Sequence, residues 1–134
     1  MDSELRVSSL PELLALSRLI NEARFNSTST DRELWASPFV LALSERVSLA
    51  LLAHYKEHAL GEMLSIYEEW QRSLPTNEAL TLIKAKLIND ARTHWWSQQN
   101  NEAKLQHLRS CITPFIVSEE FIAQLLKEVE EGTS

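Results

Sequence analysis

The chain has 134 residues, enough for one domain that buries roughly two-thirds of the surface its unfolded form exposes. Nineteen acidic against thirteen basic residues give a formal net charge of −6, which disfavours binding to nucleic-acid phosphates or to an anionic membrane. Mean hydropathy is −0.21 and the apolar runs are short, so no membrane-spanning segment is expected.

The numbers of glycines and cysteines exclude further kinds of functional site. Only Gly61 and Gly132 occur, where an average chain of this length would hold about nine glycines. Phosphate-binding loops, nucleophile elbows and dinucleotide turns all depend on glycine, so we predict a protein that is not an enzyme and needs no cofactor. Cys111 is the only cysteine, which excludes an internal disulfide and favours a small buried apolar residue. The acidic start of the chain does not resemble a targeting signal, so a cytoplasmic protein is expected.

The first helix is predicted to begin at Ser9, because serine, a first-turn proline and glutamate form a capping box in Ser9-Leu10-Pro11-Glu12. A polar loop over residues 26–30 ends this helix. Its apolar stripe consists of Leu13, Leu16, Ile20 and Ala23.

A second capping box, Thr30 with Glu33, is predicted to open a short segment, and Ser37 before Pro38 opens a long helical stretch. Apolar residues keep helical register in this stretch past Gly61, and no capping residue follows that glycine. We therefore favour one long helix over about residues 38–73, bent near Gly61. Two helices split near Gly61 are the alternative. The apolar positions are Val40, Leu43, Val47, Leu51, Tyr55, Ala59, Met63, Tyr67 and Trp70.

Three further helices are predicted after Pro75. The first is capped by Thr76, a shorter one carries Leu105 and Leu108, and the last begins at Ser118 with Gly132 as its C-cap. Together the pattern predicts an all-α, single-domain bundle of about five to seven helices over residues 1–134. The termini, residues 1–8 and 132–134, are expected to be flexible.

His54, His58 and Glu62 follow one another at steps of four positions, so on a continuous helix all three share one face. Two imidazoles and a carboxylate are suitable ligands for a divalent metal. Tyr55 stands where the zincin pattern needs a glutamate directly after the first histidine. Solvent-exposed histidines are therefore the simpler interpretation, and a metal-binding bundle is the alternative.

The four tryptophans are candidates for contact with a partner. Trp70 and Trp95 fit the apolar stripes of their helices and are predicted to lie in the core. Trp96 follows 100° further around the helix, so at least one of the adjacent pair should be partly exposed. Exposed tryptophan is common at interfaces, which predicts a partner-binding surface of Trp35, Trp95, Trp96 and Arg92. The alternative is that each tryptophan seals one end of the bundle.

Asp90 and His94 are also four residues apart on a predicted helix, where a carboxylate can orient an imidazole. No device for stabilising an oxyanion accompanies a nucleophile near them in the sequence. A surface ion pair is therefore the expected role of this pair.

These observations predict a non-catalytic, acidic protein-binding module: an adaptor, an inhibitor or immunity-type protein, or an assembly chaperone. Its partner is another protein or a second copy of the chain, because a long apolar stripe often completes its core across a two-fold axis. The metal-binding bundle is one alternative. The other is weak nucleic-acid binding through Lys84, Lys86 and Arg92 beside Trp95 and Trp96, which the net charge opposes.

Overall fold

The computed structural model describes residues 4–133, which form helices and connecting turns without any strand. In chain order the helices are α1 (Leu10–Asn21), α2 (Arg32–Trp35), α3 (Pro38–Glu57), α4 (Gly61–Gln71), α5 (Ala79–Ala91), α6 (His94–Ser97), α7 (Asn101–Ile112) and α8 (Glu119–Gly132). A π-helical turn (Glu22–Asn26) follows α1, and a 3-10 turn (Leu74–Thr76) follows α4. The predicted all-α bundle is confirmed. Two of the helices, α2 and α6, are single turns of four residues each.

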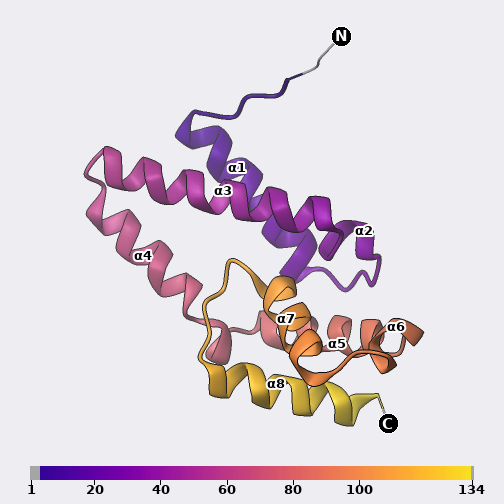
Figure 1. The fold of residues 1–134 in the computed structure, drawn as a ribbon. Helices are drawn as coiled ribbons and strands as arrows, with labels where there is room; N and C mark the ends of the chain where they lie inside the picture. Colours follow the sequence, from indigo (N-terminus) through magenta and orange to yellow (C-terminus); the bar gives the residue numbers. More distant parts are fainter. Residues whose placement is uncertain (1–3, 134) are drawn as a thin grey trace.

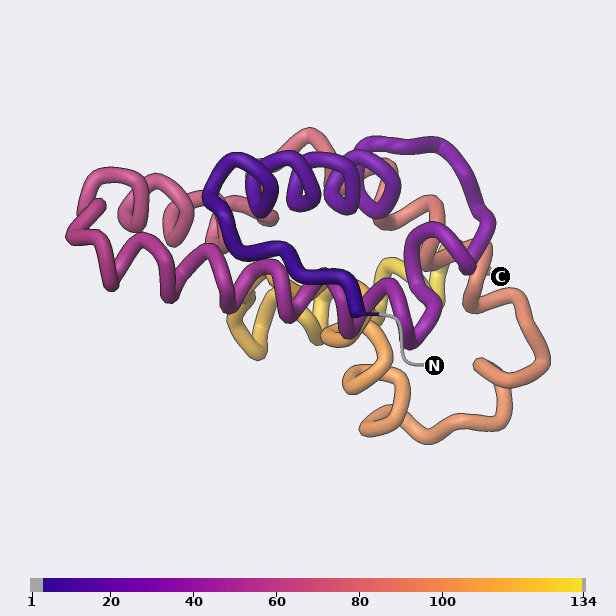
Figure 2. Tube along the Cα trace, turned by 90° about the horizontal axis from the view of Figure 1, so that it is seen from above, coloured from indigo at the N-terminus to yellow at the C-terminus, as the bar shows by residue number. Residues whose placement is uncertain are grey.

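The helices form two halves, which Figure 1 shows above and below one another. The N-terminal half consists of α1, α3 and α4, and its core of buried residues is Leu13, Ile20, Val47, Leu51 and Tyr55. The C-terminal half consists of α5 to α8 and has the larger core, which also includes Phe25 of the π-helical turn and Trp35 of α2. Seen from above in Figure 2, α1 and α3 lie side by side, with α4 continuing from the end of α3.

The long helix favoured from the sequence is divided into α3 and α4, as the alternative proposed. The break does not use Gly61 as a cap: Ala59 adopts the left-handed φ of 53°. The Leu60 N–H donates to the Tyr55 carbonyl at 2.8 Å, and the Ala59 N–H donates to the Lys56 carbonyl at 3.3 Å. These two bonds make a Schellman motif, in which Leu60 also packs with Tyr55 in the N-terminal core. Gly61 is the first residue of α4.

Side-chain caps fix most helix starts, and two of them differ from the prediction. Ser9, Ser37 and Ser118 each accept a hydrogen bond from the first turn of α1, α3 and α8, as predicted. Asp31, not Thr30, caps α2 by accepting from the Glu33 N–H at 3.0 Å. The predicted cap at Thr76 is likewise wrong, because Thr76 belongs to the 3-10 turn. Asn77 instead accepts from the Ala79 N–H at 2.9 Å where α5 begins.

The two adjacent tryptophans lie in α6 and not in α5, which ends at Ala91. This break changes the helical phase, so Trp96 is buried while Trp95 is 44% exposed. The prediction that one of the pair is partly exposed is confirmed, but the sequence assigned Trp95 to the core, which is wrong. Trp70 also lies at the edge of the C-terminal core and is only partly buried.

The end of α8 packs closely against α5. A Cβ atom at Gly132 would lie 2.5 Å from Ile88 Cδ1, so glycine lets the two helices approach. Gly132 is the last residue of the helix and Thr133 is its C-cap, which corrects the predicted role of Gly132.

At the N-terminal end of the chain, Val7 packs against the N-terminal core, within the predicted flexible segment 1–8. Residues 1–3 and 134 of the predicted flexible termini lie outside the described residues.

A buried arginine joins the two halves. Arg24, in the π-helical turn, is 1% exposed. Its guanidinium donates to the Ser44 hydroxyl of α3 at 2.8 Å, and to the backbone carbonyls of Trp35 at 3.2 Å, Cys111 at 2.7 Å and Thr113. Burial lowers the pKa of Arg24 to about 10, against a smaller opposing effect of Cys111, so the group stays charged at neutral pH.

A second buried cation supports the same turn from the C-terminal half. Lys86 of α5 donates to the carbonyls of Arg24 at 2.8 Å and Ala23 at 3.3 Å. Burial, together with the charge of Arg24, lowers the pKa of Lys86. The lysine therefore satisfies carbonyl groups that the end of the helix would otherwise leave without donors.

One segment, Arg32–Glu57, has the length and the hydropathy (1.4) of a helix that crosses a membrane, contrary to the expectation from the sequence. Serines interrupt its apolar runs without lowering the mean hydropathy much. The core helix of a soluble protein, which is mostly buried, also passes this test, whereas here 33% of the apolar window is buried, and a single such helix is weak evidence for a membrane span. The segment is divided at Ala36 and Ser37, and α3 packs against α1. The finding is therefore compatible with a soluble protein.

Candidate functional site

An apolar hollow of about 320 Å³ opens between α1 and α4. Both helices pack on α3, which supplies the floor of the hollow through the buried residues Leu51 and Tyr55. The wall on α1 consists of Leu14, Ser17, Arg18 and Asn21, and the wall on α4 of Met63, Ile66, Tyr67 and Trp70. The α4 residues follow the spacing i, i+3, i+4 and i+7, which is one apolar stripe of a helix.

A second hollow of about 380 Å³ adjoins the first one at Arg18, Asn21 and Trp70, which line both. Beyond these shared residues it extends past the π-helical turn towards the start of α5. Phe25 and Phe115 are the buried aromatic residues along it. We call the two hollows together the α1–α4 groove.

Aromatic contacts hold the α4 wall in place. The Tyr67 hydroxyl donates to the Ser48 hydroxyl of α3 at 2.7 Å, and burial raises the pKa of Tyr67. The Tyr67 and Trp70 rings lie 5.6 Å apart, and the Trp70 and Phe115 rings lie 4.5 Å apart. The wall is therefore anchored to both halves of the molecule. Ile66 is 60% exposed and projects beyond this anchored row.

Charged residues line the α1–α4 groove or lie within one helical turn of its wall on α4, and we call these positions its rims. On α4, exposed Glu62 and Glu69 lie about one turn before and after Ile66, and that helix contains no basic residue. On α1 and the following turn, exposed Arg18 and Glu22 are one turn apart. None of these four charged residues forms an ion pair within residues 4–133.

The tryptophans predicted to bind a partner do not share one surface. Trp35 and Trp96 are both buried in the C-terminal core, where neither offers area to a partner. Trp95 is partly exposed, and its ring lies 4.8 Å from the ring of His107. Arg92, the C-cap residue of α5, is exposed. Only Trp95 and Arg92 of this set are accessible.

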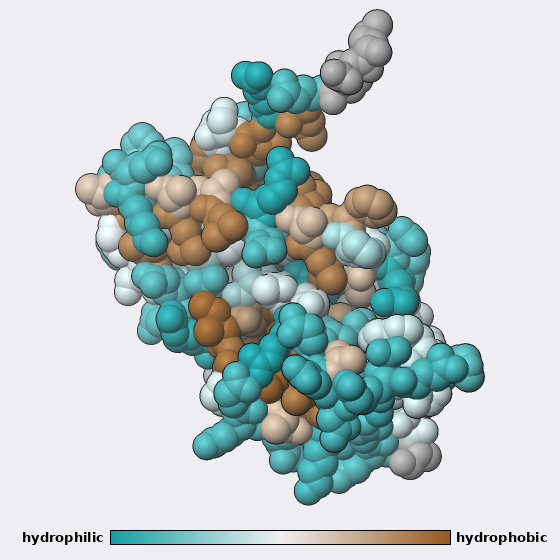
Figure 3. All heavy atoms as spheres, in the orientation of Figure 1, coloured by the Kyte–Doolittle hydropathy of each residue, from teal (hydrophilic) through white to brown (hydrophobic). Residues whose placement is uncertain are grey.

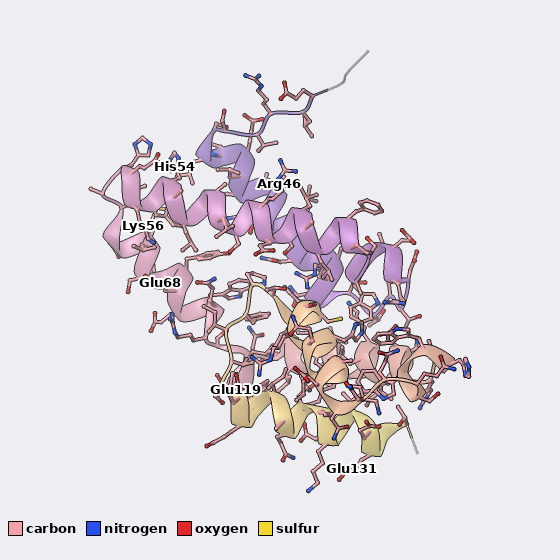
Figure 4. All side chains as sticks on the ribbon, in the orientation of Figure 1. Arg46, His54, Lys56, Glu68, Glu119 and Glu131 are labelled. Atoms are coloured by element: carbon pink, nitrogen blue, oxygen red, sulfur yellow. The ribbon has the colours of Figure 1, made fainter. Side chains whose placement is uncertain are left out.

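The predicted metal ligands are divided by the break between α3 and α4. The rings of His54 and His58 lie 4.3 Å apart at the end of α3, while Glu62 belongs to α4. Figure 4 labels His54 near this end of α3 and Glu68 on α4, beyond the turn. Throughout residues 4–133, no group of three or more His, Cys, Asp or Glu side chains is arranged to hold a metal ion. The expected stack on one continuous helical face is therefore wrong.

Asp90 does not pair with His94 but with residues distant in the sequence. Its buried carboxylate lies 2.7 Å from His107 Nε2 of α7 and 3.0 Å from Arg32 Nε of α2. The imidazole of His94 instead contacts Gln98. The expected surface ion pair is therefore wrong, because Asp90 is buried and joins three helices.

His107 brings a cysteine and a carboxylate together, in a cluster that the sequence did not predict. Cys111 Sγ lies 3.6 Å from the same Nε2 atom that contacts Asp90. In a Cys–His–Asp relay the sulfur and the carboxylate use opposite ring nitrogens. Burial lowers the pKa of His107, but the hydrogen bonds to Asp90 and Cys111 outweigh burial and raise it to about 9. A charged imidazole of this kind forms an ion pair that links α7 to α5.

The groove-lining residues Met63, Tyr67 and Trp70 belong to the predicted apolar stripe. Their position along an open groove was not predicted. A helical stripe indicates that a residue faces other apolar groups, without indicating whether these belong to the same chain. Ile66 was not assigned to the predicted stripe, although its spacing of three residues from Met63 places it on the same helical face. On the face drawn in Figure 3, apolar residues gather over α1 and α3, and hydrophilic residues cover most of α7 and α8.

Comparison of the chain with protein-family models, with curated proteins and with solved structures finds no match in any of the three.

Proposed function

We propose that the chain is a non-catalytic protein-binding module, and that the α1–α4 groove is its binding surface. The observation that carries this proposal is the apolar stripe of α4, which faces an open hollow without a neighbouring helix to cover it. Ile66, at 60% exposure, is the most accessible part of the stripe. Contiguous apolar surface of this kind marks interaction sites in soluble proteins.

The shape of the groove favours a protein partner. Two helices form its walls and a third forms its floor, the arrangement in which a fourth helix completes a bundle. Its lining is rich in aromatic and aliphatic side chains and has anchored walls, so binding orders few additional groups. These properties support the adaptor, inhibitor or assembly-chaperone roles more than a catalytic one.

The acidic character of the chain supports the same class of function. A net charge of −6 speeds association with a basic partner, although charge contributes more to association rate than to affinity. An acidic inhibitor or immunity-type protein that neutralises a basic enzyme is one form of this proposal.

Crosslinking from the groove tests the proposal. A photoreactive amino acid replaces Ile66 in the cell of origin, so that a bound partner is crosslinked and identified. The partner is then purified, and its affinity for the unmodified chain is measured by titration. We expect Ile66→Glu to weaken binding by about tenfold or more, because it places a charge in an apolar contact. Leu49→Glu is the matched control, since Leu49 is 59% exposed on the opposite side of α3 from Leu51.

Two results would contradict the proposal. One is a partner that binds the Ile66→Glu variant as tightly as the unmodified chain. The other is equal weakening by both variants, which would indicate a general effect on folding and not a contact at the groove. Circular dichroism of both variants checks that the helices are retained.

Light scattering on the untagged chain distinguishes a foreign partner from a second copy. A dimer that Ile66→Glu converts to a monomer would place a second copy in the groove. A monomer at micromolar concentration leaves the groove free for another protein.

A further inference from the structure

We infer that the occupant of the α1–α4 groove is a basic amphipathic helix of another protein. The inference rests on the proposed function, and it adds the chemical class of the partner. Three observations carry it: the spacing of the apolar wall, the charge of the rims, and the charge of α3 and α8, the two amphipathic candidates within residues 4–133.

The apolar wall has the period and length of a helix contact. Met63 and Trp70 are seven residues apart on α4, which corresponds to roughly 10 Å along the helix axis. A partner helix that presents apolar residues at i, i+3 or i+4, and i+7 spans the same distance. Leu51 and Tyr55 on the floor, with Leu14 opposite, enclose such a stripe from the other sides.

The rims indicate the charge of the partner. Of the charged residues that line the groove in residues 4–133, Arg18 and Glu22 balance each other. Glu62 and Glu69, about one helical turn on either side of Ile66, add negative charge beside the wall on α4. All four side chains are exposed and none is engaged in an ion pair within residues 4–133. A helix with Lys or Arg beside its apolar stripe places positive charge against these carboxylates. An acidic helix would be repelled by them.

Within residues 4–133, neither the exposed apolar face of α3 nor the amphipathic helix α8 offers this combination. The outer face of α3 carries Phe39, Leu43 and Leu49, but its four charged residues, Glu45, Arg46, Lys56 and Glu57, sum to zero. The amphipathic helix α8 contains five glutamates and one lysine. A second copy therefore fits the charge of the groove less well than a different, basic protein.

A displayed library of helical peptides provides the test. The peptides are about 16 residues long, roughly 24 Å of helix, and their sequences are randomised at exposed positions. Selection uses the unmodified full chain, with the Ile66→Glu variant as the counter-target that removes peptides bound elsewhere. We expect the enriched peptides to carry a net positive charge and apolar residues at i, i+3 or i+4, and i+7.

Charge reversal on the rim then tests whether peptide affinity depends on the charge of the peptide as well as on its apolar contacts. The double variant Glu62→Lys with Glu69→Lys should weaken binding of the enriched peptides by about tenfold. Added salt should diminish this effect. The control pair Glu45→Lys with Glu102→Lys changes the net charge equally, on α3 and α7 outside the groove, and should leave affinity unchanged.

The outcomes distinguish the inference from the proposed function. Peptides that depend on Ile66 but show no preference for positive charge would overturn the basic partner and leave the protein-binding groove standing. If no peptide depends on Ile66, the groove itself is not a helix-binding site and both fail. Equal weakening by the rim pair and the control pair would assign the effect to net charge, and would also overturn the inference.

Discussion

The two halves of the molecule bury their apolar residues to very different extents. Sixteen buried residues form the core of the C-terminal half, whereas five form the core of the N-terminal half. The N-terminal half surrounds its small core with partly buried side chains such as Leu14, Met63 and Tyr67, which line the α1–α4 groove. A half that keeps a groove open cannot also fill it with its own side chains. Under the proposed function, the N-terminal half would bind the partner and the more densely packed C-terminal half would support it.

Removing the charge that joins the halves tests whether they are one cooperative unit. Arg24→Met should lower the free energy of unfolding by about 4 kcal/mol, because three buried carbonyls and the Ser44 hydroxyl lose their donor. Urea unfolding followed by circular dichroism measures this loss. Arg18→Met, at the exposed rim of the groove, should change it by less than about 0.5 kcal/mol. A loss below about 1 kcal/mol for Arg24→Met would mean that water replaces the guanidinium.

Raising the pH should weaken the C-terminal half selectively. The pKa of His107 is about 9 in the folded chain, above its ordinary value of 6.5, so the charged imidazole stabilises the fold. This contribution is complete below pH 6.5 and is lost as pH rises through 9. The loss amounts to about 3 kcal/mol between pH 6 and pH 10.

Thermal or urea unfolding across that pH range measures the effect, and His107→Gln is the control because it removes the titrating group. The variant should show a smaller dependence on pH than the unmodified chain. Equal slopes for the two proteins would assign the pH dependence to other groups. Cys111→Ala separates the contribution of the neighbouring thiol, which lies 3.6 Å from the imidazole.

Matched leucine substitutions compare the two cores directly. Leu125 and Leu51 are each 1% exposed, one in each half. Leu125→Ala should cost about 4 kcal/mol because it leaves a closed cavity, and Leu51→Ala about 2–3 kcal/mol because its site borders the open groove and water can enter. Chemical unfolding of both variants gives the difference. Equal losses would show that the floor of the groove is as tightly packed as the C-terminal core.

The turn between α3 and α4 offers the smallest and most local test. Ala59→Gly should raise the free energy of unfolding by about 1 kcal/mol, because glycine adopts the φ of 53° without the cost that Cβ imposes. Gly61→Ala is the complementary control. It lies at the start of α4 with nothing within 4 Å of an added Cβ, so it should be neutral or stabilising. A destabilising Ala59→Gly would show that this turn is not strained.

The sequence predicts the fold class and many helix starts, because these depend on local chemistry. Ser9, Ser37 and Ser118 cap their helices where serine precedes an apolar stripe. The break near Ala59 was not located correctly, since a left-handed alanine leaves no local signal and the apolar register continues across it. The cost of about 1 kcal/mol at such a residue is repaid by packing of Leu60 and Tyr55, which is tertiary information.

The candidate site could be predicted only in part, for the same reason. Met63, Tyr67 and Trp70 were identified as an apolar stripe, but the sequence does not reveal that α1 leaves their outer side uncovered. Asp90 was paired with His94 from spacing alone, whereas its partners Arg32 and His107 come from distant segments. Burial of Trp35 and Trp96 depends on where short helices begin and end, which residue patterns locate least accurately.

The carbonyls that Arg24 binds have a consequence for synthesis on the ribosome. Cys111 and Thr113 follow Arg24 by 87 and 89 residues, so they leave the exit tunnel long after α1 and α3 have emerged. Until then the arginine lacks two of its four acceptors, and closing the interior around it would be costly. The early part of the nascent chain should therefore stay loosely packed and exposed to chaperones or proteases until the last third of the protein has been made.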